Sequence, residues 1–217
     1  MRGAHGSPKG AGMKRILQPV TSSTGPLAVP PELGEFVRTY RQRCVGVIDR
    51  IPDEAVGELI RILHEARQSR RQIFICGNGG SAATASHFSS GLGKDGSWGR
   101  QQRFRVAALT DNVPWITALA NDSEYSQIFV EQLKNHADRG DVLIVFSASG
   151  ASPNVLHAAE WANDNGLVTV AITGRAGTPL GKSSRHCIAV ESGHPGHVEE
   201  AHFLIQHLVT YYFLEEE

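Results

Sequence analysis

A run of apolar residues that ends in a glycine cluster constrains the fold of this chain more than any other feature. The run is Ile73-Phe74-Ile75-Cys76, and Gly77-Asn78-Gly79-Gly80-Ser81 follows it directly. This pattern predicts a buried strand followed by a helix of small residues that packs closely on a sheet. Glycines at the junction allow a sharp turn and the close approach of a ligand. Free N–H groups at the helix start, with Ser81 as the predicted cap, favour an anion or a sugar hydroxyl, although a simple tight turn is the alternative.

From residue 72 onward, apolar strand patterns alternate with amphipathic helix patterns. Strands are predicted at 72–76, 104–109, 141–146, 167–172 and 186–190. Helices are predicted at 81–91, 113–120, 123–137, 153–165 and 198–212, with a short helical turn after Thr178. Such alternation indicates βαβ units and a parallel sheet covered on both faces. The expected fold class is therefore α/β, a three-layer αβα sandwich with a five-stranded parallel sheet.

The part of the chain before residue 72 divides into two regions. Residues 1–30 are rich in Gly, Ser and Pro and are predicted to be a disordered N-terminal arm, in part a cloning remnant. Residues 31–217 are predicted to form a single domain. Its first two helices begin at Pro31 and at Pro52-Asp53. The basic run at 67–71 is interpreted as the solvated end of the second helix.

Charge and cysteine content exclude several classes of protein. The net charge of −1 offers no general attraction for nucleic acid or an anionic membrane. No apolar run approaches the roughly 18 residues needed to span a bilayer. Cys44, Cys76 and Cys187 lack the spacing of a disulfide framework or a thiolate zinc site. We therefore expect a cytoplasmic protein with neither nucleic acid nor membrane as a partner.

A second loop, at the end of the third predicted strand, resembles the first because it also joins a strand to the start of a helix and is rich in hydrogen-bond donors. Ser152 is a predicted N-cap, with Pro153 at the first helical position. Ser147 and Ser149 add hydroxyl donors beside the free N–H groups of this helix. Ligands of parallel sheets bind at the carboxyl ends of the strands. Two such loops predict a neutral, donor-rich cradle for a phosphorylated polyol, whereas one alone is well explained as a capped turn.

The last predicted helix carries acidic and imidazole groups among its apolar residues: Glu199, Glu200, His202, Gln206 and His207. Another histidine, His87, lies on the helix after the glycine loop. A lone histidine in such a helix is usually structural. Histidine titrates near neutral pH and is able to bind metal or move protons, so this group is a candidate catalytic or metal site.

At these residues the chain resembles the sugar isomerase (SIS) fold and, within it, the phosphoheptose isomerases. The resemblance runs from about residue 32 to the end. Its motifs are Cys76-Gly77-Asn78-Gly79-Gly80-Ser81-Ala82-Ala83, His87-Phe88, Ala120-Asn121-Asp122, Gly140-Asp141-Val142-Leu143, Ser147-Ala148-Ser149-Gly150-Ala151-Ser152-Pro153-Asn154 and Glu200-Ala201-His202. The resemblance implies a homotetramer with active sites at subunit contacts and no nucleotide cofactor. It also implies interconversion of sedoheptulose 7-phosphate and an aldoheptose 7-phosphate.

The resemblance further implies a role for individual residues. Those that match positions contacting sugar or phosphate are Asn78, Gly79, Gly80, Ser81, Asp122, Ser147, Ser149 and Ser152. His207 matches the catalytic histidine of the family, which is also able to bind zinc. His87 matches a second histidine that binds zinc.

The departures from the family pattern bear on the chemistry. Four residues beyond His87, where the family has a glutamate that is a proposed base and metal ligand, this chain has Gly91. Glu199 stands in place of a glutamine that contacts substrate and metal. The remaining departures are Thr84 for an aspartate, and Ala148 and Ala151 for a threonine and an asparagine of the phosphate loop.

Isomerisation through an enediol needs a base that moves a proton between adjacent carbons and an acid for the carbonyl oxygen. The hypothesis is that Glu199 is the base or a metal ligand and His207 the acid, around zinc held by His87, Glu199 and His207. Residues 199 and 207 of one straight helix lie about 12 Å apart along its axis. Sharing one ion therefore requires long side-chain reach, a helix that starts after Glu199, or ligands from two subunits.

Two functions from different classes follow. The first is an aldose–ketose isomerase that converts sedoheptulose 7-phosphate to D-glycero-D-manno-heptose 7-phosphate, or acts on an eight-carbon analogue. The alternative is a non-catalytic SIS module that binds a phosphosugar or a protein, like a replication-initiator-binding member of the family. Glu199 and His207 together favour the enzyme. The missing carboxylates at Gly91 and Thr84 favour the binding module.

Overall fold

The computed structural model describes residues 30–215 and confirms the predicted α/β fold. Five strands form one parallel sheet in the order β2-β1-β3-β4-β5. The strands are β1 (Gln72–Gly77), β2 (Arg105–Ala108), β3 (Val142–Ser147), β4 (Val168–Thr173) and β5 (His186–Ala189). Each strand agrees with its predicted range to within one or two residues.

Successive residues of the central strands enter two different hydrophobic cores. In β1, Ile73 and Ile75 belong to one core, whereas Phe74 and Cys76 belong to the other. Side chains of a strand alternate between the two faces of a sheet, so an unbroken apolar run fills both cores. This is why the central strands contain no polar alternation.

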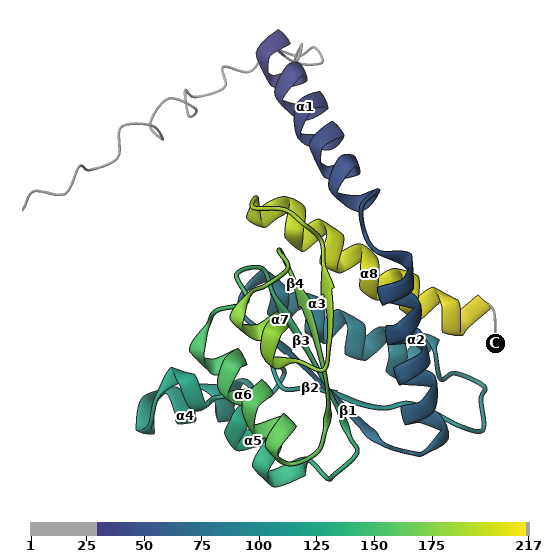
Figure 1. Cartoon of the computed structure of the whole chain (residues 1–217), viewed down its shortest axis with the longest axis vertical. Helices are drawn as coiled ribbons and strands as arrows, with labels where there is room; N and C mark the ends of the chain where they lie inside the picture. The colour runs from purple at the N-terminus through teal and green to yellow at the C-terminus, as the bar shows by residue number, and fades with distance from the viewer. Residues whose placement is uncertain (1–29, 216–217) are drawn as a thin grey trace, which may run out of the picture. The chain divides into compact units, whose positions relative to one another are not determined.

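Helices cover both faces of the sheet. One core is closed by α2 (Asp53–Gln68), α3 (Gly80–Ser90) and α8 (Pro195–Glu215). The other is closed by α4 (Val113–Asp122), α5 (Val130–His136), α6 (Pro153–Asp164) and α7 (Pro179–Ser183). Figure 1 shows α4, α5 and α6 on one side of the strands and α2 and α8 on the other.

The chain divides into two compact units, Met1–Arg38 and Thr39–Glu217, with the boundary inside α1 (Pro31–Ile48). The features discussed below all belong to the second unit. The predicted disorder of residues 1–30 concerns a segment that, apart from Pro30, lies outside the described residues. None of the helices within 30–215 combines the length and apolar character that crossing a membrane requires.

Three predicted helices differ most from the structure. The helix predicted at 123–137 is a 3-10 turn (Tyr125–Gln127) followed by α5. Ile128, Phe129 and Val130 are all buried there, and one amphipathic helix cannot turn three successive side chains inward. The helix predicted at 81–91 is regular to Ser90 and continues as a π-helical turn (Gly91–Asp95), and α8 begins at Pro195 rather than at residue 198.

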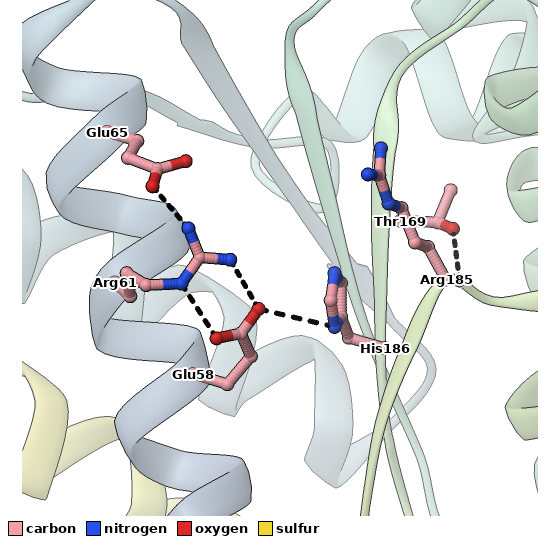
Figure 2. Close-up of polar contacts among 6 residues, drawn as sticks. All are labelled: Glu58, Arg61, Glu65, Thr169, Arg185 and His186. Atoms are coloured by element: carbon pink, nitrogen blue, oxygen red, sulfur yellow. Dashed lines mark hydrogen bonds and ion pairs between the residues drawn. The ribbon is translucent and has the colours of Figure 1, made fainter.

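Polar side chains attach α2 to the sheet at the amino end of β5, as Figure 2 shows. Arg61 lies between Glu58 and Glu65 on the helix, and its Nε donates to Glu58 Oε2 at 2.8 Å. His186 Nδ1 lies 3.7 Å from Glu58 Oε1. The amino ends of parallel strands lie at the edge opposite the glycine and serine loops. This cluster therefore anchors the helix and is not part of the predicted site.

The interpretation of the basic run at 67–71 as a solvated helix end is wrong for Arg67. Its side chain is buried, with 6% of its surface exposed. The guanidinium carbon lies 5.0 Å and 5.2 Å from the ring centroids of Phe104 and Phe213. These distances suit cation–π contacts, so an arginine at this position packs between aromatic rings instead of extending into water.

Candidate active site

The glycine loop joins β1 to α3, and close packing explains its composition. A Cβ atom on Gly77 would lie 2.7 Å from Ser81 Cβ and 2.8 Å from the carbonyl oxygen of Phe146. Gly79 has a φ of 56° and is the N-cap of α3. Ser81 therefore does not cap the helix, contrary to prediction; it is buried in the first turn. Glycine is required here by contact at one position and by backbone conformation at the other.

Asn78 links this loop to the start of α6. Its Nδ2 donates to Asn154 Oδ1 at 2.9 Å, and Asn154 Nδ2 donates back to Asn78 Oδ1 at 2.8 Å. Tyr125 O–H donates to the same Oδ1 at 3.1 Å. One N–H of the Asn78 amide remains for a ligand. Sequence reasoning missed Tyr125, because only the tertiary fold brings this residue next to Asn78.

The serine loop runs from the end of β3 to α6. Ser147 Oγ accepts from Gly150 N at 3.1 Å, and Ser149 Oγ accepts from Ala151 N at 3.3 Å. Ser152 is the N-cap residue as predicted, but its hydroxyl makes no capping hydrogen bond. A hydroxyl that accepts one bond still has its own O–H to donate. The loop therefore presents three hydroxyl donors at the carboxyl end of β3.

The structure does not join Asp122 to these residues. It ends α4, its side chain is exposed, and its Oδ1 accepts a hydrogen bond from Asn121 Nδ2 at 2.8 Å. Among residues 30–215, no hydrogen bond or ion pair connects Asp122 with the glycine or serine loop. The family role of Asp122 stays a prediction.

Two of the predicted histidines meet between α3 and α8. His87 Nε2 and His207 Nε2 are 3.0 Å apart, which is hydrogen-bonding distance. The Phe203 ring lies against both, with centroid separations of 4.9 Å and 4.8 Å. Desolvation, and then the charge of His87, lower the pKa of His207. One of the two nitrogens donates and the other accepts, so two neutral rings take opposite tautomers here and orient each other.

Glu199 lies at the amino end of α3. A Cβ atom on Gly80 would be 2.6 Å from Glu199 Oε2, so only a glycine leaves room for this carboxylate. Negative charge is favoured beside the first turn of a helix. Glu199 lines a hollow of about 520 Å³ with Tyr40, Thr84, Glu200 and Phe203. Because Phe203 also contacts both histidines, one aromatic side chain borders the carboxylate hollow and the histidine pair.

The geometry of α8 limits how Glu199 and His207 act together. The helix is continuous from Pro195 to Glu215, so the option of a helix that starts after Glu199 is wrong. Eight residues of one helix correspond to about 12 Å along its axis. No group of three His, Cys, Asp or Glu side chains that could hold a metal ion forms within the part of the chain that the structure describes.

The histidine pair is nevertheless compatible with two positions of a zinc site. Two nitrogens bound to one tetrahedral zinc are separated by about 3.3 Å, which follows from Zn–N distances near 2.0–2.1 Å. The observed separation of His87 Nε2 and His207 Nε2 is 3.0 Å. The pair therefore fits two zinc ligands, while a third has to come from Glu199 by side-chain reach or from another subunit.

Gly91 is buried at the point where α3 becomes a π-helical turn. A Cβ atom there would lie 2.8 Å from Thr210 Oγ1 and 3.0 Å from Thr210 Cγ2. Thr210 thus occupies the space into which a side chain at position 91 would point. π-Helical turns within helices are frequent at functional sites. In this chain the turn leaves no room for a side chain at position 91.

His202 lies outside the candidate site. It is fully buried on the inner face of α8, with its ring centroid 5.7 Å from that of Phe146. Burial lowers its pKa to about 4, so its imidazole is neutral at physiological pH. Of the histidines on α8, only His207 reaches His87.

Another hollow lies along β2, away from both loops. It has a volume of about 800 Å³ and is bordered by Phe74, Arg105, Trp115, Gln132 and His136. None of the predicted site residues lines it. Its size alone therefore does not make it the candidate active site.

Known proteins are similar to this chain in sequence and in fold. The family model described as SIS domain matches residues 35–174. The phosphoheptose isomerase of Mycobacterium tuberculosis is 34% identical over 175 residues, which cover 81% of this chain and 89% of the relative. That of Akkermansia muciniphila is 34% identical over 186 residues, covering 82% and 94%. The structure of a phosphoheptose isomerase from Francisella tularensis has a TM-score of 0.76 and 28% identity, and covers 86% of this chain and 97% of that one. The chain belongs to the SIS domain family and, within it, to the phosphoheptose isomerases.

Proposed function

We propose that this protein is an aldose–ketose isomerase that converts sedoheptulose 7-phosphate to D-glycero-D-manno-heptose 7-phosphate, or acts on an eight-carbon analogue. Its relatives at 34% identity are named phosphoheptose isomerases. The observation that carries the proposal over a binding module is the contact of His87 and His207 at 3.0 Å. A module that only binds a phosphosugar has no need for two imidazoles oriented by each other.

In the proposed mechanism the two loops bind the sugar phosphate and α8 supplies the chemistry. Hydroxyls of Ser147, Ser149 and Ser152 donate to the phosphate, and Asn78 donates its remaining amide N–H to the sugar. The carboxylate of Glu199 removes a proton from the carbon next to the carbonyl, and after exchange with solvent it delivers a proton to the adjacent carbon. In the free protein His207 Nε2 is hydrogen-bonded to His87 Nε2, so this contact opens when the substrate binds. His207 Nε2 then donates a proton to the carbonyl oxygen as the enediol forms, and it takes a proton from the hydroxyl of the adjacent carbon as the enediol collapses to the aldose.

Zinc is a candidate cofactor of the same site. His87 and His207 would hold the ion, with Glu199 as the third ligand, and a bound zinc would polarise the substrate carbonyl. Metal analysis of purified wild type, Glu199→Gln and His87→Ala tests this. We expect zinc in the wild type and less in both variants. Wild-type protein that carries no metal after purification and zinc addition contradicts the zinc proposal and leaves the acid–base roles in place.

Assembly as a homotetramer, with sites at subunit contacts, is part of the proposal. Large apolar side chains remain exposed on α8, namely Leu208, Tyr211, Tyr212 and Leu214. Exposed apolar surface of this kind marks contacts between subunits. A second subunit would also supply a carboxylate near the histidine pair. The cytoplasmic location stays a prediction of the sequence.

Proton exchange from solvent tests the isomerase directly. The protein is incubated with sedoheptulose 7-phosphate in deuterated water, and deuterium at the carbon next to the carbonyl is measured by NMR. We expect incorporation with the wild type, none with His207→Ala, and a strongly reduced rate with Glu199→Gln. His136→Gln, a variant of an exposed histidine on α5, should behave as wild type. No exchange by the wild type with any six- to eight-carbon ketose phosphate overturns the proposal and favours the binding module.

A further inference from the structure

A hollow beside the serine loop contains a positive charge that sequence reasoning did not single out. It has a volume of about 300 Å³, at the lower end of the range for small-molecule sites. Its lining includes Ala148, Ser149, Arg175, Thr178, Ser192 and Gly193. These residues follow β3, β4 and β5, so the hollow lies at the carboxyl ends of three neighbouring strands, where ligands of parallel sheets bind.

Backbone hydrogen bonds hold the three loops around this hollow together. Gly174 N donates to the carbonyl oxygen of Ala148 at 3.2 Å, and Ser192 N donates to that of Gly174 at 2.7 Å. Thr173 Oγ1 donates to the carbonyl oxygen of Arg175 at 2.9 Å. A Cβ atom on Gly174 would lie 2.5 Å from the Ala148 oxygen, so glycine is needed for this approach. Arg175 therefore projects from a fixed backbone.

The guanidinium of Arg175 lies directly over Gly193. A Cβ atom at position 193 would overlap one of its Nη atoms, so any side chain there would displace the guanidinium. No carboxylate within residues 30–215 forms an ion pair with Arg175. The nearby acid Glu191 accepts a hydrogen bond from the backbone N–H of Ala176 at 2.8 Å. The hollow thus holds a cation whose charge no described side chain neutralises.

Two donors that the family pattern places in the phosphate loop are absent from this chain. Ala148 and Ala151 stand where a threonine and an asparagine are usual, and Ala148 lines the same hollow as Arg175. A guanidinium offers several N–H donors and a full charge, and it binds phosphate oxygens in a bidentate manner. The loss of neutral donors and the presence of an uncompensated arginine therefore occur at one place.

We propose that Arg175 is a specificity-determining residue that binds the substrate phosphate in this hollow, together with the hydroxyl of Ser149, which lines the same hollow. The inference rests on the proposed function for the identity of the substrate, but the binding of a phosphate group by Arg175 does not depend on isomerase activity. The phosphate is remote from the carbons that react. Arg175 therefore stabilises the ground state and the transition state equally, and its loss raises KM far more than it lowers kcat.

The experiment compares Arg175→Gln, Arg175→Lys and Gly193→Val with wild type. Calorimetry measures the Kd of inorganic phosphate, and the isomerase assay measures KM and kcat for sedoheptulose 7-phosphate. We expect Arg175→Gln to weaken phosphate binding and to raise KM by about tenfold to a hundredfold, as for a lost hydrogen-bonded charge, with kcat within about twofold of wild type. Arg175→Lys should recover part of the loss. Gly193→Val should resemble Arg175→Gln, because it displaces the same guanidinium.

Arg103→Gln is the matched control, because this exposed arginine precedes β2 and so lies at the opposite edge of the sheet. It should leave both the Kd and KM unchanged. Phosphate binding equal to wild type in Arg175→Gln overturns the inference, even if the isomerase is active. Wild-type protein that binds no phosphate also overturns it. Phosphate binding that depends on Arg175, in a protein without isomerase activity, supports the inference and contradicts only the proposed function.

Discussion

At position 91 the fold leaves no space for a side chain. The Cβ direction of Gly91 points at Thr210, whose Oγ1 and Cγ2 would lie 2.8 Å and 3.0 Å away. A carboxylate side chain at position 91 therefore cannot be accommodated unless Thr210 is displaced. The chain has instead a carboxylate at Glu199, which lies against Gly80 at the other end of α3. At the scale of single residues, the chain has a carboxylate beside the first turn of this helix and no space for one at its last turn.

Gly91→Ala tests this contact. Its methyl group would overlap Thr210, so we expect the free energy of unfolding to fall by about 1–2 kcal/mol, even though alanine favours helix formation. Thermal and urea unfolding measure the change. In the double variant Gly91→Ala/Thr210→Ala the two closest atoms are gone, and the loss due to position 91 should disappear. If Gly91→Ala lowers the free energy of unfolding by the same amount with and without Thr210→Ala, the contact is contradicted.

His202 makes stability depend on pH. Burial lowers its pKa to about 4, below the ordinary value near 6.5, so between these values the unfolded chain binds a proton that the folded chain does not. Its contribution to stability is complete above pH 6.5 and is lost as pH falls toward 4. We expect a loss of about 2 kcal/mol from this residue at pH 5 relative to pH 7.

Urea unfolding at pH 7 and pH 5 measures this difference. His202→Gln should show a smaller fall between the two pH values, whatever its stability at pH 7. His136→Gln, in which an exposed histidine is replaced, should keep the wild-type difference. A pH dependence that is the same in His202→Gln and wild type would refute the assignment.

At the scale of elements, α3 and α8 build the candidate site between them. Helix α3 supplies His87 and the glycine at its first turn, and α8 supplies Glu199, Phe203 and His207. Sequence reasoning identified both helices from their apolar periodicity. It did not show that α8 is continuous through Glu199 or that Phe203 also packs against His87, because the contact with His87 depends on how the two helices pack.

Substitutions at two helix glycines, Gly80 and Gly57, distinguish a glycine that close packing requires from one that it does not. Gly80→Ala should displace the Glu199 carboxylate and lower kcat by about tenfold or more, with little change in the melting temperature. Gly57→Ala in α2 is the control, because no atom lies within 4 Å of its added Cβ. It should keep full activity and gain up to about 1 kcal/mol of stability. In a Glu199→Ala background Gly80→Ala should have no further effect on kcat, and an additive effect would contradict the contact.

At the scale of the whole molecule, the outer face of α8 bears on the proposed assembly. Leu208 and Tyr212 line an apolar hollow of about 530 Å³ between α8 and α2, with Ile51, Val56 and Ile60. Leu208 and Tyr212 have 47% and 39% of their surface exposed. A large apolar surface on a helix that also carries the proposed catalytic residues is expected to be covered by another subunit.

Leu208→Lys/Tyr212→Lys should dissociate the proposed tetramer. Size-exclusion chromatography with light scattering should give four chains for the wild type and fewer for the variant, with a matching loss of activity if subunit contacts complete the site. Trp98→Lys is the control, since this side chain is exposed but lies outside α8. A wild type that is a monomer, or a variant that remains a tetramer, would contradict the assembly.

The sequence by itself determined the strands, the two loops and the ligand class of this protein. Each follows from local rules: unbroken apolar runs for buried parallel strands, and glycine or serine clusters where a strand meets a helix. The helix predicted at 123–137 and the cap at Ser81 failed for the same reason, because burial of Phe129 and the conformation of Gly79 override local preference.

Only the tertiary structure decided which side chains meet. His87 and His207 are 120 positions apart in the sequence, and their contact exists because α3 and α8 lie side by side on one face of the sheet. From the sequence Arg175 is an ordinary loop cation, and only the fold shows that the loops after β3, β4 and β5 form a hollow beside it. Periodicity and propensity act over a few residues, whereas a site depends on distances between elements, and these are set only when the cores close.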